Sequence, residues 1–204
     1  MAVTAAESFV SCLLQMAEAE TNPVLEIIDL EKPLQENKKY PIGLLQFNQT
    51  GWRAYYHCHP ASRAGNHRFN GEHGHFHIFV RIHTEPERWS HLVALAMDNM
   101  GQALGWFSVN HWVTGEEWES ADVLSKHLKD IPFNKQITQL ETWLLSLLSL
   151  SCDTVMTVLE ERDCIIKKKQ SGMKCLDIKK ARGLYLLSER AINLEELIEN
   201  KIRL

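Results

Sequence analysis

The chain lacks the features that mark secreted, membrane-spanning and nucleic-acid-binding proteins. Its five cysteines are an odd number, widely spaced and without a Cys-x-x-Cys pair, which argues against a disulfide scaffold and favours a reducing compartment. The net charge of −4 is not the basic balance that non-specific nucleic-acid binding requires. The longest apolar run, residues 143–152, is too short to span a bilayer.

Targeting signals, repeats and low-complexity tracts are also missing from the sequence. The first residues carry no basic region, and Glu7 comes early, so they do not form a secretory signal. We therefore predict a cytoplasmic protein with neither a membrane nor a nucleic acid as partner. Its 204 residues suffice for one sizeable core, and we expect a single domain over residues 1–204. Residues 1–135 should form a sheet-centred part, and residues 136–204 should be mainly helical.

Helical patterns stand at both ends of the chain. Thr4 and Glu7 have the spacing of a capping box, and the apolar residues after them predict a helix that ends near Glu20. From Ile137 an apolar stripe continues to about Lys168, which predicts one helix of roughly 30 residues. Residues 183–188 fit a late strand or a helical turn, and a last short helix follows residue 193.

The middle of the chain alternates as strands do. Residues 52–59 are rich in aromatic side chains, and residues 72–82 follow after a loop with glycine and asparagine. Residues 89–112 read as a hairpin with a turn at 98–101, although a helix over 87–100 is the rival interpretation. These patterns predict an α+β fold: a largely antiparallel sheet flanked by helices, with a helical C-terminal part.

Histidines concentrate in these strands, and seven of the ten lie between residues 57 and 83. Because strand side chains alternate between faces, His73, His75 and His77 should share one face. His57 and His59 should share a face of the preceding strand. If the two strands pair as antiparallel neighbours, all five imidazoles can meet on one surface of the sheet.

Neutral imidazole is the commonest metal ligand in proteins, and this clustering therefore predicts a mononuclear metal site. Three imidazoles, or two with a carboxylate, leave one coordination position open for chemistry. Iron, copper and zinc all suit such a donor set, and the sequence does not choose between them. We expect His67, His83, His91 and His127 to be ordinary surface or hydrogen-bonded residues. The predicted ligands are His57, His59, His75 and His77, and the residues predicted to act in catalysis are Glu72, His73 and His111.

Two resemblances bear on this interpretation. The strings Tyr-Tyr-His-Cys-His at 55–59 and Glu-His-Gly-His-Phe-His at 72–77 resemble an uncharacterised bacterial domain family. That resemblance implies a shared fold and a shared site, but no established reaction. Residues 73–79 also resemble the His-φ-His-φ-His-φ-φ signature of histidine-triad nucleotide hydrolases and transferases, apart from Gly74 at an apolar position. The second resemblance implies that His75 attacks phosphorus without a metal.

These observations favour a metal-dependent enzyme that acts on a small-molecule substrate. The wealth of imidazoles and neighbouring aromatic residues favours oxidoreductase or oxygenase chemistry slightly over hydrolysis. Two alternatives stay open. One is a histidine-triad-like phosphoryl or nucleotidyl hydrolase or transferase without metal, and the other is a non-catalytic carrier of a metal or haem.

Overall fold

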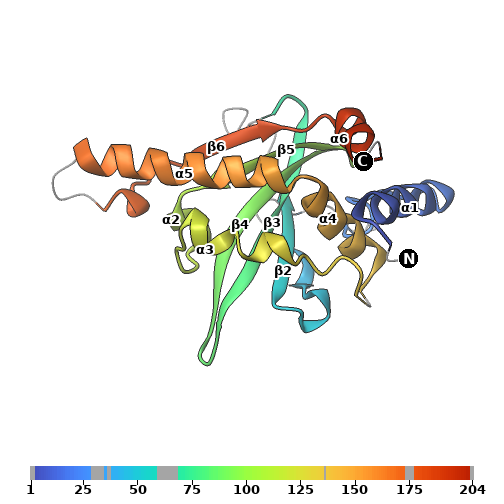
Figure 1. Cartoon of the computed structure of the whole chain (residues 1–204), viewed down its shortest axis with the longest axis horizontal. Helices are drawn as coiled ribbons and strands as arrows, with labels where there is room; N and C mark the ends of the chain where they lie inside the picture. Colours follow the sequence, from blue (N-terminus) through green and yellow to red (C-terminus); the bar gives the residue numbers. More distant parts are fainter. Residues whose placement is uncertain are drawn as a thin grey trace.

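The protein is described by a computed structural model that covers residues 3–28, 35, 38–58, 69–135, 137–172 and 177–202. It confirms the α+β fold with an antiparallel sheet and helices (Figure 1). In chain order the helices and strands are α1 (Ala5–Glu18), β1 (Tyr40–Leu45), β2 (Trp52–Cys58), β3 (Glu72–Thr84), β4 (Glu87–Asp98), β5 (Ala103–Val109), α2 (His111–Thr114), α3 (Ala121–Leu124), α4 (Gln139–Leu150), α5 (Cys152–Gly172), β6 (Leu186–Ala191) and α6 (Leu194–Ile202).

The sheet has the simplest antiparallel topology. Among the described residues it contains six strands in the order β1-β2-β3-β4-β5-β6, and each strand pairs with its neighbour in sequence order. The strand β6 joins the sheet after several intervening helices and pairs with β5. The predicted mainly helical part therefore also supplies a strand to the sheet. For residues 183–188, which the sequence left open as a strand or a helical turn, the structure shows that a strand begins at Leu186.

One face of the sheet forms the main hydrophobic core with the helices. Phe76, Ile78 and Val80 alternate along β3 and are fully buried against helix residues that include Trp143 and Val158. Figure 1 shows α5 crossing this part of the molecule beside β5 and β6, with α1, α4 and α6 gathered at one end. The opposite side chains of the same strands are thereby available for a site.

The capping signals at the first helix are confirmed. The Thr4 hydroxyl accepts from the Glu7 backbone N–H, and the Glu7 carboxylate accepts from the Thr4 N–H. This exchange satisfies two amide hydrogens that a helix start leaves without an intrahelical acceptor. The same reciprocal arrangement joins Thr138 and Glu141 at the start of α4.

The single long helix predicted from residue 137 is wrong, because two helices occupy its place. α4 ends at Leu150, and α5 begins at Cys152 at an angle of 73° to it. Ser151 caps α4 with its backbone N–H, which donates to the carbonyls of Leu147 and Leu148. The apolar stripe continues through the bend because both helices pack on the same core, so periodicity alone does not reveal the break. Among the described residues no single helix is long and apolar enough to cross a membrane, and only this bent pair meets that test jointly.

The second predicted hairpin is confirmed as β4 and β5, so the helical alternative for residues 87–100 is wrong. The Asp98 carboxylate accepts from the N–H groups of Met100 and Gln102, which closes the turn between the strands. The return strand is shorter than predicted. It ends at Val109, because Asn110 caps the short helix α2 that contains His111.

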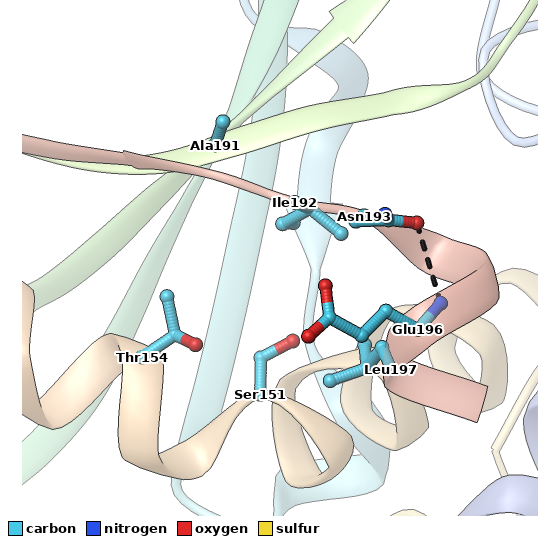
Figure 2. Close-up of a pocket in the computed structure, with 7 residues that line it drawn as sticks. All are labelled: Ser151, Thr154, Ala191, Ile192, Asn193, Glu196 and Leu197. Atoms are coloured by element: carbon cyan, nitrogen blue, oxygen red, sulfur yellow. Dashed lines mark hydrogen bonds between the residues drawn. The ribbon is translucent and has the colours of Figure 1, made fainter. Parts of the chain in front are cut away.

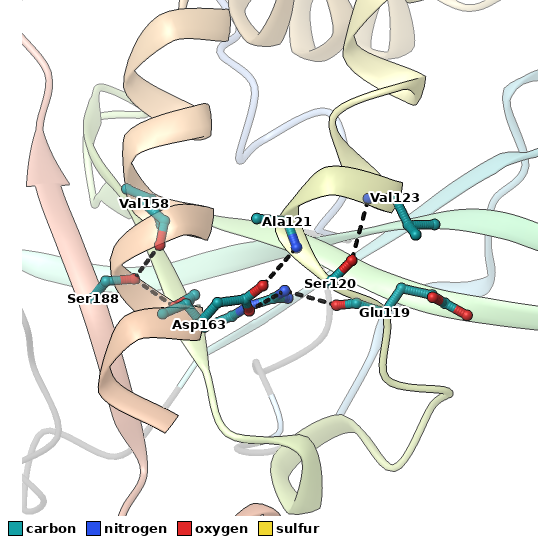
Figure 3. A network of polar contacts seen from close by, with 9 residues as sticks. Glu119, Ser120, Ala121, Val123, Val158, Asp163 and Ser188 are labelled. Atoms are coloured by element: carbon teal, nitrogen blue, oxygen red, sulfur yellow. Dashed lines mark hydrogen bonds and ion pairs between the residues drawn. The ribbon is translucent and has the colours of Figure 1, made fainter. Parts of the chain in front are cut away.

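A buried arginine ties α5 to the segment before α3. Arg162 is only 2% exposed, and it donates to the Glu119 carbonyl and the Asp163 carboxylate. Asp163 also accepts from the Ala121 backbone N–H, and the Ser188 hydroxyl of β6 donates to the Val158 carbonyl (Figure 3). These contacts join α3, α5 and β6 through hydrogen bonds that are largely shielded from water.

Candidate metal centre

The pairing of β2 with β3 brings together histidines from two strands. His57 lies directly opposite His75 in the antiparallel register, and Tyr55 lies opposite His77. Alternation then places the side chains of His57, His75 and His77 on the face away from the main core. The predicted pairing of these strands is confirmed.

A β-bulge at the start of β3 decides which residues join this face. Glu72 pairs with Asp98 and Gly74 pairs with Met97, so β3 has one more residue than β4 at this point, namely His73. An extra residue reverses the alternation on one side of the bulge. Glu72 therefore faces the same way as His75, and its Oε1 lies 3.0 Å from His75 Nδ1.

The contact between Glu72 and His75 is deeply buried. The Glu72 residue is 4% exposed and His75 is 0% exposed. Since a carboxylate accepts, His75 donates from Nδ1, and its Nε2 is left to point toward the other histidines. A carboxylate behind the outer nitrogen of an imidazole is the arrangement that fixes the tautomer and raises the basicity of metal-binding histidines.

A second bulge, in β4, brings a fourth histidine to the site. Ile78 pairs with Val93 and Phe79 pairs with His91, so Leu92 is the extra residue. Leu92 then packs in the main core, and His91 turns to the histidine face. His91 Nε2 lies 2.9 Å from His77 Nδ1.

His91 is an electrically neutral neighbour of His77. Burial lowers the pKa of His91 to about 3, and the positive charge of Arg162 contributes in the same direction. A neutral imidazole has one donor and one acceptor nitrogen, so His91 can accept the Nδ1 proton of His77. His77 thus has the same kind of support from His91 that His75 has from Glu72.

One ring nitrogen from each of His57, His75 and His77 completes a group that could hold a metal ion. These three nitrogens lie within 4.8 Å of one another. His75 and His77 are buried, whereas His57 is half-buried, so the group has a sheltered side and an accessible side.

The residues of the group fit a metal ion chemically. His57 Nε2 lies 2.6 Å from His75 Nε2, which is a hydrogen-bond distance. Two nitrogens that share one zinc ion at about 2.0–2.1 Å lie roughly 3.3 Å apart in tetrahedral geometry. The rings of His57 and His75 would therefore have to separate by less than about 1 Å to share an ion. Three neutral imidazoles are a donor set that iron, copper and zinc accept.

Aromatic and small side chains surround the group. Phe107 from β5 meets His75 edge-on at a centroid distance of 5.1 Å, and Tyr55 lies 5.2 Å from His77. Ala94 and Ala96 stand opposite His77 and His75 in β4, where larger side chains would fill the space of the imidazoles. Burial, with the negative charge of Glu116, raises the pKa of Tyr55 to about 12, so its phenol stays protonated at neutral pH.

The prediction that His73 shares a face with His75 and His77 is wrong. His73 Nδ1 lies 2.7 Å from the Tyr56 hydroxyl, and the two rings are stacked. Tyr56 belongs to the main core and contacts Phe76, so His73 lies on the opposite face from the site. The cause is the bulge, because His73 is itself the extra residue. Burial lowers the pKa of His73, although Asp98 acts in the opposite direction.

The structure places His111 elsewhere as well. With Arg53 and Glu116 it lines a pocket of about 600 Å³ whose lining residues do not include His57, His75 or His77. Arg53 forms an ion pair with Glu116, so its charge is already compensated, and its guanidinium stacks over Trp89. His111 is not part of the group of three histidines, and its predicted catalytic role stays a prediction.

Two histidines of the predicted cluster, His59 and His67, lie outside the described residues. The predicted participation of His59 as a ligand therefore stays a prediction. The sequence predicts an ordinary surface or hydrogen-bonded ring for His91. The ring is hydrogen-bonded, but the prediction does not identify His77 as its partner. The available signal is a histidine within the otherwise apolar run of β4, but alternation without the bulge points it away from the site.

The chain belongs to the family described as "Domain of unknown function (DUF6969)", whose model matches residues 3–192. This confirms the resemblance to an uncharacterised domain family, and the matching family is not that of the histidine-triad proteins. No curated protein and no solved structure matches the chain.

Gly74 gives a test of how tightly the two strands must approach at the site. A Cβ at this position would lie 2.4 Å from the Tyr56 hydroxyl oxygen and 2.6 Å from the His57 carbonyl oxygen. We expect Gly74→Ala to lower the free energy of unfolding by about 1–3 kcal/mol, because the added methyl forces β2 and β3 apart. Denaturant unfolding followed by circular dichroism measures this.

Gly183→Ala is the matched control, because a Cβ there meets no atom within 4 Å. The control should be close to the unmodified protein in stability. Equal stability of the two variants would show that the close approach at Gly74 is not a constraint on the pairing.

Proposed function

We propose that this protein is a metal-dependent enzyme that holds one transition-metal ion with His57, His75 and His77. The observation that carries the proposal is the convergence of three ring nitrogens, two of them on buried rings whose outer nitrogens meet Glu72 and His91. Buried imidazoles brought together in this way are costly unless their polar atoms are satisfied, and a shared ion satisfies them. The three ligands leave at least one coordination position for water or a substrate.

The residues around the site have separable tasks in this proposal. Glu72 accepts the Nδ1 proton of His75, and His91 accepts the Nδ1 proton of His77, so both rings present Nε2 inward. His57, the most accessible of the three, lies on the side from which a small molecule can approach. A bound ion would supply either activation of dioxygen or activation of water, according to its identity.

We favour redox chemistry with iron or copper over hydrolysis with zinc. Three imidazoles suit all three metals, so our preference rests on the side chains around them. Phe107, Phe79 and Tyr55 enclose the histidines with rings that exclude water and offer few proton acceptors. A hydrolytic site needs a base beside the attacking water, whereas Glu72 is engaged behind His75.

The two alternative functions fare differently. A histidine-triad phosphotransferase needs three histidines on one face of a single strand, and His73 does not meet this requirement. A metal carrier needs the same three ligands as an enzyme, but it has no need for an exchangeable position. The carrier is therefore the alternative that experiments must separate from the proposal.

Metal analysis of protein purified without a histidine tag tests the proposal directly. We expect close to one equivalent of iron, copper or zinc per chain, and its loss in the double variant His75→Ala/His77→Ala, because a single imidazole retains little affinity. Inductively coupled plasma mass spectrometry after dialysis measures the content. The control is His83→Ala/His127→Ala, which removes two histidines that are not in the group and should retain the metal. Equal metal content in the two double variants would refute the assignment.

The supporting residues make a second prediction. Glu72→Gln and His91→Leu keep all three ligands but remove the partners of their outer nitrogens. Metal affinity should fall about 10–100-fold in each variant, because such partners orient the imidazole and raise its basicity. Competition with a chromophoric chelator measures the affinity, with the exposed pair Glu87→Gln and His83→Leu as controls. Affinity unchanged in both supporting-residue variants would contradict the roles given to Glu72 and His91.

An open coordination position distinguishes the enzyme from the carrier. Cobalt(II) bound in the site should give visible absorption bands that shift on addition of azide, because azide enters the position that substrate or water would use. A titration followed by absorption spectroscopy measures the shift. Bands that stay unchanged at saturating azide would favour a closed carrier site over an enzyme.

A further inference from the structure

A second pocket lies at the junction of helices and sheet, apart from the histidines. It has a volume of about 280 Å³ and is formed where α4 meets α5, where β6 ends and where α6 begins (Figure 2). None of its residues belongs to the candidate metal centre, so a ligand in this pocket is independent of the proposed function. The pocket is lined by Ser151, Thr154, Ala191, Ile192, Asn193, Glu196 and Leu197.

Ser151 is the unusual residue of this pocket. It is 2% exposed, and its Oγ has no hydrogen-bond partner among the described residues. Its backbone N–H already caps α4 by donating to Leu147 and Leu148. A buried hydroxyl without a partner is destabilising, and such groups in native proteins call for an explanation. Figure 2 shows this hydroxyl directed across the pocket toward the Glu196 side chain.

Glu196 places a negative charge opposite Ser151. Its backbone N–H donates to Asn193 Oδ1 over 3.3 Å, which fixes the first turn of α6 from which the side chain extends (Figure 2). The carboxylate forms no ion pair within the part of the chain that the structure describes. Glu195 stands on the same turn but does not line the pocket. The Glu196 carboxylate is therefore the group of the pocket wall that favours a cation.

The rest of the wall limits what kind of cation fits. Ala191, Ile192 and Leu197 supply apolar surface, and Thr154 adds a second hydroxyl. Magnesium and calcium require several carboxylate or carbonyl oxygens with defined geometry, whereas this pocket offers one carboxylate. A primary ammonium donates three hydrogen bonds from one charged atom and carries an alkyl body that apolar surface can cover.

We propose that this pocket binds the ammonium group of a small primary amine. The ammonium lies between the Glu196 carboxylate and the Ser151 hydroxyl, and the alkyl part of the amine contacts Ile192 and Leu197. Ligand binding thereby gives the buried Ser151 hydroxyl a hydrogen-bond partner and gives Glu196 a counter-charge.

The test is a titration of the 204-residue chain with n-butylammonium chloride, followed by two-dimensional amide NMR spectra. We expect saturable shifts at Ser151, Glu196 and their neighbours. Glu196→Gln and Ser151→Ala should each weaken binding at least about 10-fold, because each loses one partner of a charge-assisted contact. Glu195→Gln is the matched control on the same turn, and it should bind as the unmodified protein does.

Two further measurements keep the test decisive. Ser151→Ala should not lower the melting temperature of the free protein, since the hydroxyl has no partner there, so weaker binding by this variant cannot be ascribed to unfolding. Butanol, which has the same length but no charge, should not compete. Absence of saturable binding, equal binding by Glu196→Gln, or equal binding of butanol would each overturn the proposal, as would a preference for magnesium or calcium chloride at equal concentration.

Discussion

The candidate site depends on the register of β2 against β3. His57 stands opposite His75 only in this register, and a slip of one residue would turn the whole apolar set of a strand to the wrong face. The register is held by the main core, where Tyr56 contacts Phe76 at a ring distance of 5.1 Å, and by Gly74, over which the Tyr56 hydroxyl lies. Neighbouring residue pairs along the same two strands therefore fix the packing on one face and the convergence of imidazoles on the other.

Two β-bulges turn a row of alternating histidines into a supported site. The bulge at His73 brings Glu72 behind His75 and sends His73 to the Tyr56 side, and the bulge at Leu92 brings His91 behind His77. Bulges are known to re-aim side chains near functional sites. Here the bulges remove His73 from the site face and place Glu72 and His91 behind two of the three remaining histidines. This arrangement favours a compact three-histidine centre over a diffuse polar face.

The sequence predicts the parts of the molecule whose periodicity is regular. The aromatic alternation of residues 52–58 and the apolar alternation after residue 75 identify β2 and β3 and place His57, His75 and His77 on one face. Bulges cannot be predicted in this way, because an extra residue does not change the amino-acid composition of the strand. Beyond the extra residue, each side chain faces the side of the sheet opposite to the one that alternation predicts. Alternation therefore misplaces both His73 and His91. The bend at Ser151 is hidden for a related reason, since both helices bury the same kind of face and the apolar stripe continues across the break.

The central claim is that His57, His75 and His77 bind one ion together. X-ray absorption spectroscopy at the K-edge of the bound metal tests it most directly, because imidazole rings give characteristic multiple scattering. We expect three imidazole ligands in the unmodified protein and two in His57→Ala, with no sulfur in either. A spectrum dominated by sulfur, or one in which His57→Ala leaves the number of imidazoles unchanged, would contradict the claim.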